Sequence, residues 1–136
     1  MQLLTKKDGK RLKKIFHNHL NVYSEENEDV MTKFIKYLKR YSIECIVTDK
    51  ERITFAHGKR VSKYVGMSLD CQLKEYANTD YFHSGRSSYL KIADKTYIRS
   101  VYYFDSLGID EPNGCIYFFY PWSKSEYALD LVLLIN

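Results

Sequence analysis

The segment from residue 43 to residue 58 decides the fold: it reads Ile43-Glu44-Cys45-Ile46-Val47-Thr48-Asp49-Lys50-Glu51-Arg52-Ile53-Thr54-Phe55-Ala56-His57-Gly58. Its two ends are rich in apolar and β-branched residues, and the four residues between them, 49–52, are all polar. Two apolar runs of this length, separated by a short polar turn, predict a pair of antiparallel strands. Gly58 then ends the second strand. The fold is therefore expected to be built on an antiparallel sheet that starts here.

Two helices are predicted ahead of this hairpin. Thr5 is a candidate N-cap for the first helix, and the following side chains recur on one face of it: Leu12, Ile15, Phe16, His19 and Leu20. Ser24 opens the second helix, and acidic residues occupy its first turn, where the helix dipole favours them: Glu25, Glu26, Glu28 and Asp29. Apolar residues then repeat at helical spacing as far as Tyr41.

Behind the hairpin, the sequence predicts a short helix capped by Ser68, three more strands and a closing helix. The strands are expected at 89–93, 97–104 and 115–120, with a turn-rich loop at 105–114. Ser123 and Glu126 have the spacing of a capping box in front of the closing helix, 124–135. Five strands with mostly short connections predict an α+β fold, in which a five-stranded antiparallel sheet carries its helices on one side.

The chain is expected to form a single domain, because its 136 residues match the usual size of one domain and no linker-like stretch divides them. Residues 1–41 would be its N-terminal helical segment and residues 42–136 its α/β body. The N-terminal residues are charged rather than apolar, and the apolar stretch 128–135 is too short to cross a bilayer. We therefore expect a cytoplasmic protein that does not enter a membrane.

Short stretches of the body resemble the PAS/GAF/Cache group of sensor domains. They are Ile46-Val47-Thr48-Asp49-Lys50-Glu51-Arg52-Ile53, Ala56-His57-Gly58, Lys63-Tyr64-Val65-Gly66-Met67-Ser68-Leu69 and Gly114-Cys115-Ile116-Tyr117-Phe118-Phe119. The resemblance implies a five-stranded antiparallel sheet, a ligand pocket between the sheet and the short helices, and an N-terminal helix used for dimerisation. Because the sequence carries no kinase, cyclase or helix-turn-helix pattern, a signal would have to pass to another protein by binding.

Patterns typical of catalytic or metal sites are missing from the sequence. His17 and His19 are two residues apart, so on a helix their side chains point about 200° apart and cannot share one metal ion. Ser84-Gly85-Arg86-Ser87 is not a nucleophile elbow, and neither a dinucleotide-binding nor a phosphate-loop motif occurs. The three cysteines are far apart. We therefore expect a non-enzymatic protein without a cofactor or metal.

A ligand pocket is the favoured site. Arg99 lies within an apolar strand, where a partly buried guanidinium needs an anionic partner, and a ligand carboxylate or phosphate could supply a two-pronged contact. The alternative is that Arg99 faces water or pairs with an acidic side chain: Glu44, Asp94 or Asp105. The expected ligand-binding residues are Arg99, His57, Arg86, Tyr97 and Tyr103, and Tyr117 is expected on the same sheet face as the two other tyrosines.

A second candidate site is indicated by charge. Residues 6–14 contain one acid, Asp8, and six basic residues: Lys6, Lys7, Lys10, Arg11, Lys13 and Lys14. Residues 1–40 carry ten basic and five acidic residues, and the remainder carry eleven and twelve, so the excess positive charge lies in the helical segment. A basic helix can contact nucleic-acid phosphates or an acidic partner. The alternative is an ordinary solvated face.

These patterns together predict a regulatory or sensory binding module of PAS/GAF-like type. It would be a homodimer that binds a small anionic ligand and signals through a protein partner. The alternative is a small interaction or inhibitor protein that acts on nucleic acid, or on a nucleic-acid enzyme, through its basic N-terminal helix.

Overall fold

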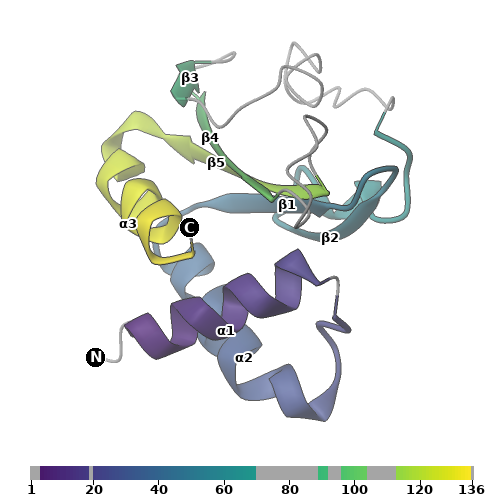
Figure 1. Ribbon diagram of the computed structural model, residues 1–136. Helices are drawn as coiled ribbons and strands as arrows, with labels where there is room; N and C mark the ends of the chain where they lie inside the picture. Colours follow the sequence, from purple (N-terminus) through teal and green to yellow (C-terminus); the bar gives the residue numbers. More distant parts are fainter. Residues whose placement is uncertain (1–3, 19, 70–88, 92–95, 104–112, 136) are drawn as a thin grey trace.

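A computed structural model describes residues 4–18, 20–69, 89–91, 96–103 and 113–135, and for residues 89–91, 96 and 99–103 it describes the backbone alone. The elements follow one another along the chain as α1 (Lys6–His17), α2 (Glu25–Arg40), β1 (Glu44–Thr48), β2 (Ile53–His57), η1 (Ser62–Tyr64), β3 (Tyr89–Lys91), β4 (Thr96–Tyr103), β5 (Gly114–Pro121), η3 (Trp122–Lys124) and α3 (Ser125–Ile135) (Figure 1). The two η elements are single turns of 3-10 helix.

The strands form one sheet in the order β2-β1-β5-β4-β3, and all neighbours are antiparallel. Four strands make the body of the sheet, and the three-residue β3 adds a fifth at the edge beside β4. The predicted α+β class is confirmed: along the chain, two helices precede the strands of the sheet and one follows them. The hairpin of β1 and β2 also forms as predicted, since Asp49 Oδ1 accepts hydrogen bonds from the backbone N–H groups of Glu51 and Arg52, both at 2.7 Å.

The sheet separates two hydrophobic clusters. On one face, side chains of β1, β2 and β5 pack against all three helices, and this main core includes Leu12, Phe16, Phe34, Leu38, Val47, Phe118, Tyr120 and Leu131. On the opposite face, the buried residues are Ile46, Ile53, Val61, Tyr64, Ile98, Cys115, Tyr117 and Phe119. Because β5 is the middle strand and is covered on both faces, all of its residues except Pro121 are buried.

The segment that resembles the opening of a helix in sensor domains has a different conformation. Met67 accepts a backbone hydrogen bond from Ile53 at 2.9 Å, and Leu69 donates one to Glu51 at 3.0 Å. Ser68 pairs with Arg52 in an isolated antiparallel bridge. The expected N-cap Ser68 is therefore in an extended segment that runs along the start of β2, and the rest of the expected short helix lies outside the described residues.

The start of the closing helix also differs from the prediction. Ser123 lies within the 3-10 turn η3, and α3 begins only at Ser125. The turn begins directly after Pro121, which cannot donate a backbone hydrogen bond to the sheet and so marks the end of β5. Among the helices that the structure describes, none is long and apolar enough to cross a membrane.

Candidate ligand-binding groove

The predicted pocket residues His57 and Arg99 share one row across the sheet. His57 on β2 pairs with Cys45 on β1, Cys45 pairs with Phe118 on β5, and Phe118 pairs with Arg99 on β4. Three strand spacings of about 4.8 Å separate the two backbones, roughly 14 Å in all. The structure therefore aligns His57 and Arg99 but does not bring them together around one point.

The other pocket residues lie in different settings. Arg86 lies outside the described residues, and for Arg99 and Tyr103 only the backbone is described, so their roles in binding a ligand stay predictions. The Tyr97 ring packs at the edge of the main core, with ring centroids 6.3 Å from Tyr120 and 5.1 Å from Trp122. Tyr117 belongs to the cluster on the opposite face. The expectation that Tyr97 and Tyr117 share a face was wrong, because the register pairs Tyr97 with Tyr120 and places Tyr117 three residues away along β5.

His57 ends β2 half-buried, and its surroundings disfavour a positive charge. Burial lowers the pKa of His57, and the nearby Lys39 lowers it further, while Glu44 acts in the opposite direction. Glu44 itself is paired with Arg60, at 3.2 Å. A neutral imidazole can still donate and accept hydrogen bonds, but it adds no charge that would attract an anion.

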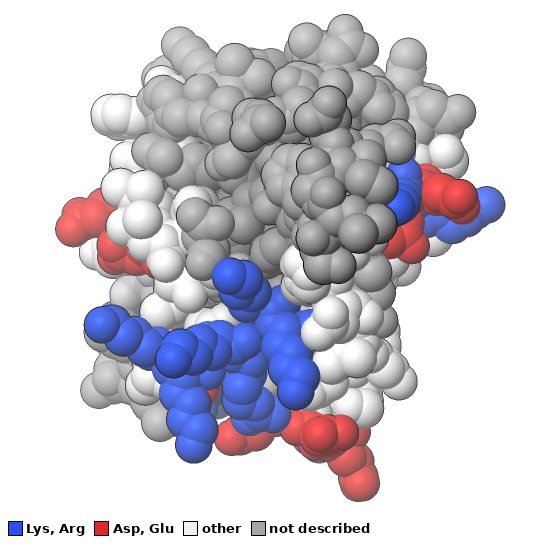
Figure 2. Space-filling model, in the orientation of Figure 1, with Lys and Arg blue, Asp and Glu red and all other residues white. Residues whose placement is uncertain are grey.

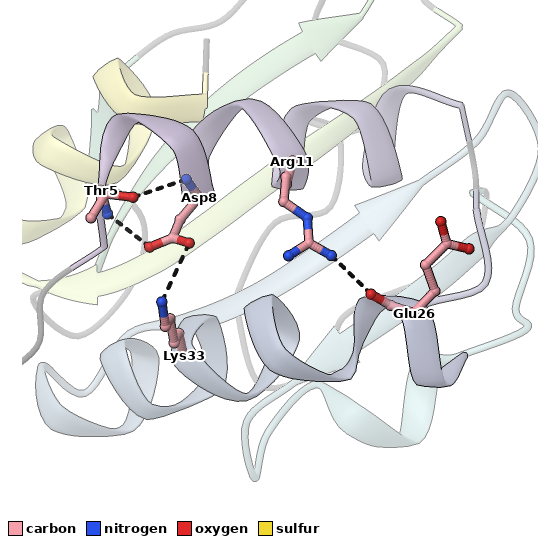
Figure 3. Close-up of polar contacts among 5 residues, drawn as sticks. All are labelled: Thr5, Asp8, Arg11, Glu26 and Lys33. Atoms are coloured by element: carbon pink, nitrogen blue, oxygen red, sulfur yellow. Dashed lines mark hydrogen bonds and ion pairs between the residues drawn. The ribbon is translucent and has the colours of Figure 1, made fainter.

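The predicted basic helix is positioned by polar contacts with α2 (Figure 3). Thr5 and Asp8 form a capping box, in which each side chain accepts a hydrogen bond from the other residue's backbone N–H, at 3.1 and 2.9 Å. The second carboxylate oxygen of Asp8 lies 3.6 Å from Lys33 Nζ on α2. Asp8 is only 7% exposed. The single acid within the basic run is therefore shielded from solvent, and its carboxylate is bound by Thr5 and Lys33.

One of the six basic residues also contributes to the contact between α1 and α2. Arg11 donates a hydrogen bond from Nη2 to the backbone carbonyl of Glu26, at 2.8 Å (Figure 3). The other five are exposed on α1, and we call them the basic face: Lys6, Lys7, Lys10, Lys13 and Lys14. Figure 2 shows these blue side chains gathered over α1, with acidic side chains along the lower edge of the patch.

A groove of about 670 Å³ runs between this helix and α3, with the end of α2 beneath it. We call it the basic–aromatic groove. Lys6, Lys10 and Lys13 line it from α1, and their spacing of four and three residues places them on one side of the helix. The remaining lining residues come from Leu4, from α2 with the residue that follows it and from α3: Tyr37, Tyr41, Tyr127, Asp130, Leu131, Leu133 and Leu134.

Three tyrosines form the aromatic part of the groove. The rings of Tyr41 and Tyr127 are stacked, with centroids 3.8 Å apart and planes 9° apart, and Tyr37 meets Tyr41 edge-on at 4.8 Å. The Tyr37 hydroxyl donates a hydrogen bond to the Tyr127 carbonyl, at 3.0 Å. Burial raises the pKa of Tyr37, and Asp130 raises it further. Tyr37 therefore stays protonated and holds α3 against α2.

The groove suits binding better than proton transfer or nucleophilic attack. Its described lining consists of lysines, tyrosines, leucines and one aspartate, so a ligand would meet flexible ammonium groups on one wall and apolar surface on the other. An ammonium group is a three-donor point charge that attracts carboxylate, sulfate or phosphate without demanding one geometry. A volume of this size is within the usual range for small-molecule sites, about 300–1,000 Å³.

The described residues form neither a metal-binding cluster nor a reactive cysteine site. Within that part of the chain, His, Cys, Asp and Glu side chains form no group of three that could hold a metal ion. Cys45 and Cys115 are buried thiols that form no disulfide, and burial raises the pKa of Cys45, which keeps it in the unreactive protonated form. Cys71 lies outside the described residues.

Comparisons of this chain with protein-family models, curated proteins and solved structures find no match. The sequence predicted the three lysines of the groove as part of the basic helix, but it did not predict its tyrosines. The signal in the sequence for the basic wall was the spacing of Lys6, Lys10 and Lys13, which places them on one side of α1.

Proposed function

We propose that this protein is a regulatory binding module of PAS/GAF-like type, which acts in the cytoplasm without catalysing a reaction, and that its basic–aromatic groove binds an organic anion with an apolar body. The observation that carries the proposal is the pairing of two unlike walls in one groove. Lys6, Lys10 and Lys13 form a basic wall, and the leucines and tyrosines of α2 and α3 form an apolar one.

The fold supports the sensor part of the proposal in general terms. An antiparallel sheet follows a helical segment, as the resemblance implies, although the segment holds two helices where the resemblance implies one. Residues 66–69 make backbone hydrogen bonds to Glu51 and Ile53 at the hairpin of β1 and β2. The groove lies on the helical side of the sheet, whereas the resemblance places a pocket beside the short helices. The proposed ligand site is therefore a feature of this chain's own α1 and α3.

The proposal predicts which ligands bind. A carboxylate or sulfonate attached to an aromatic ring or alkyl chain should bind, because its charge meets the lysines while its body displaces water from apolar surface. Anilinonaphthalene sulfonate is a suitable probe, since it has both parts and its fluorescence rises in apolar surroundings. Alkyl and aryl carboxylates can then be ranked by how well they displace it.

Matched variants test the site. We expect Lys6→Gln/Lys10→Gln/Lys13→Gln to weaken probe binding about tenfold or more, which corresponds to roughly 1.4 kcal/mol. Lys7→Gln/Lys14→Gln removes charge from the same helix outside the groove lining and should change affinity little. Asp130→Asn should tighten binding, because it removes a negative charge from the groove. Equal losses in both lysine variants, or no effect of Asp130→Asn, would show that the probe does not bind in the groove.

A second candidate function has its own supporting observation. Asp8 is buried in the capping box and paired with Lys33, so the exposed face of α1 is basic along its whole length. Such a face could contact nucleic-acid phosphates, and the binding constant would then fall steeply with salt. In that case Lys7→Gln/Lys14→Gln would weaken duplex binding as strongly as the groove variant does. Retention assays with duplex DNA and RNA at several salt concentrations distinguish the two functions.

A further inference from the structure

The outward side of α3 carries an exposed stripe that combines apolar and acidic residues. Leu133 is 68% exposed and Leu129 is 36% exposed, although the other side of the helix is in the core. Glu126 and Asp130 are also exposed, one turn apart. All four lie on one side of the helix because their spacings are three and four residues. We call these four residues the α3 stripe.

The α3 stripe borders the basic–aromatic groove. Asp130 and Leu133 belong to the stripe and also line the groove, while Lys6, Lys10 and Lys13 line it from α1. Figure 1 shows α3 and α1 next to each other on the same side of the molecule. One side of the groove therefore has an acidic, leucine-bearing rim, and the other side has a basic rim.

We propose that a second copy of this chain covers the groove in a twofold-symmetric dimer. In this arrangement the α3 stripe of each copy lies across the groove of the other. Leu129 and Leu133 meet the apolar floor of the groove, and Glu126 and Asp130 face Lys10 and Lys13 of the second copy. A twofold axis makes each contact twice, so a surface that carries both halves of the contact is complementary to itself.

Charge favours a second copy over an unrelated partner. A partner for this surface must present acids and apolar side chains to the lysines, and at the same time basic side chains to Glu126 and Asp130. The chain itself meets both requirements with residues that lie on the two rims of one groove. Two leucines alone are too small an interface, so the dimer requires the stripe, the groove and α1 together to supply the roughly 800 Å² per partner of a stable interface.

The dimer also offers a means of regulation, and this part rests on the proposed function. The organic anion and the carboxylates of the second copy would compete for the same lysines. Two ligands that exclude each other are linked, so binding of the anion must weaken dimerisation by the same factor by which dimerisation weakens binding of the anion. The protein would then report its ligand by separating into monomers.

Sedimentation of the ligand-free full chain over a range of concentrations tests the dimer. We expect a reversible dimer that weakens with salt. Lys10→Glu/Lys13→Glu and Glu126→Lys/Asp130→Lys should each raise the dissociation constant about tenfold or more. The chain that carries all four changes should dimerise again, because the charges are exchanged between the two rims. Lys7→Glu/Lys14→Glu is the matched control and should leave the dimer unchanged.

Leu133→Ser is an independent variant that adds no charge, and it should weaken the dimer while circular dichroism shows an intact fold. A chain that remains monomeric at all concentrations would overturn the proposal. So would a dimer that none of these variants weakens, or one that the four-residue exchange fails to restore.

The regulatory part is tested with anilinonaphthalene sulfonate, which should shift the dimer towards monomer. A dimer that binds the probe without dissociating would overturn only the competition, whereas failure of the probe to bind would count against the proposed function and leave the dimer standing.

Discussion

Gly9 of α1 lies directly against the main-chain carbonyl of Leu134 in α3. A Cβ atom at Gly9 would be 2.5 Å from that oxygen and 2.6 Å from the Leu134 Cγ atom. Both distances are well below van der Waals contact, so only a residue without a side chain allows the two helices to approach this closely. This contact sets the separation of the two helices that form the walls of the groove.

Gly9→Ala is therefore expected to destabilise the protein. At an open helical position, glycine to alanine would stabilise the helix by about 1 kcal/mol. Here the added methyl group must push α3 away from α1, which typically costs about 1–3 kcal/mol. Thermal or urea unfolding should show a net loss of stability, and Lys7→Ala on the exposed face of α1 should change stability by less than about 0.5 kcal/mol. A more stable Gly9→Ala protein would contradict the close approach of the helices.

Ser42 offers a stabilising substitution. It follows α2 with a left-handed φ of 55°, and the backbone bonds from Ile43 to Leu38 (2.9 Å) and from Ser42 to Lys39 (3.4 Å) form a Schellman motif. Glycine adopts this conformation without the strain that a Cβ atom brings. Removing the left-handed strain should gain about 1–2 kcal/mol, and the greater freedom of glycine in the unfolded chain should cost about 0.4–1 kcal/mol. Ser42→Gly should therefore raise the unfolding free energy by about 0.5–1 kcal/mol. Ser42→Ala keeps the Cβ atom and should give no such gain, so an equal gain in both variants would rule out this explanation.

His57 should make stability depend on pH near neutrality. Burial and Lys39 lower its folded-state pKa, whereas the unfolded value is about 6.5. The unfolded chain therefore binds the proton more readily, and stability falls as the pH drops below about 6.5 towards the folded-state pKa. Urea unfolding of the wild type and His57→Gln across this range provides the measurement. The variant should lose that part of the slope, and an unchanged slope would assign it to another group.

Asp8 should act in a lower pH range. Burial alone would raise its pKa, but the hydrogen bonds from Thr5 and the charge of Lys33 outweigh burial and lower it. The stabilisation is complete above the unfolded pKa of about 4 and is lost as the pH falls through the folded value. Asp8→Asn should be less stable at neutral pH and should lose less stability on acidification. If both proteins lose stability equally between pH 5 and 2, Asp8 is not responsible.

Local signals explain which elements could be predicted from the sequence. β2 has the predicted bounds, and α1 starts after the predicted cap Thr5, because strand alternation and capping depend on residues that are close along the chain. The 3-10 turn η1 was missed, since a single turn has no periodicity to detect. The start of α3 was placed too early because Ser123 and Glu126 have capping-box spacing, although Ser123 lies in the 3-10 turn η3 and α3 begins only at Ser125.

The groove could be predicted only in part, because its walls meet through long-range packing. The lysine cluster of α1 is visible in the sequence, but nothing local indicates that Tyr127 would stack on Tyr41 or that Leu134 would touch Gly9. The ion pair between Asp8 and Lys33 was equally hidden, because it depends on how α1 and α2 cross. The shared face expected for Tyr97 and Tyr117 failed because it required the exact register of β4 and β5.

The packing of α1 against α3 has a consequence for biosynthesis. The ribosome delivers α1 early and α3 late, so a nascent chain has the lysines long before it has the opposite wall. A protease that removes α3 would likewise leave the lysines without the leucines and Tyr127. Under the proposed function, only a chain that carries both helices would recognise the anion, and recognition would therefore also report that both walls of the groove are present.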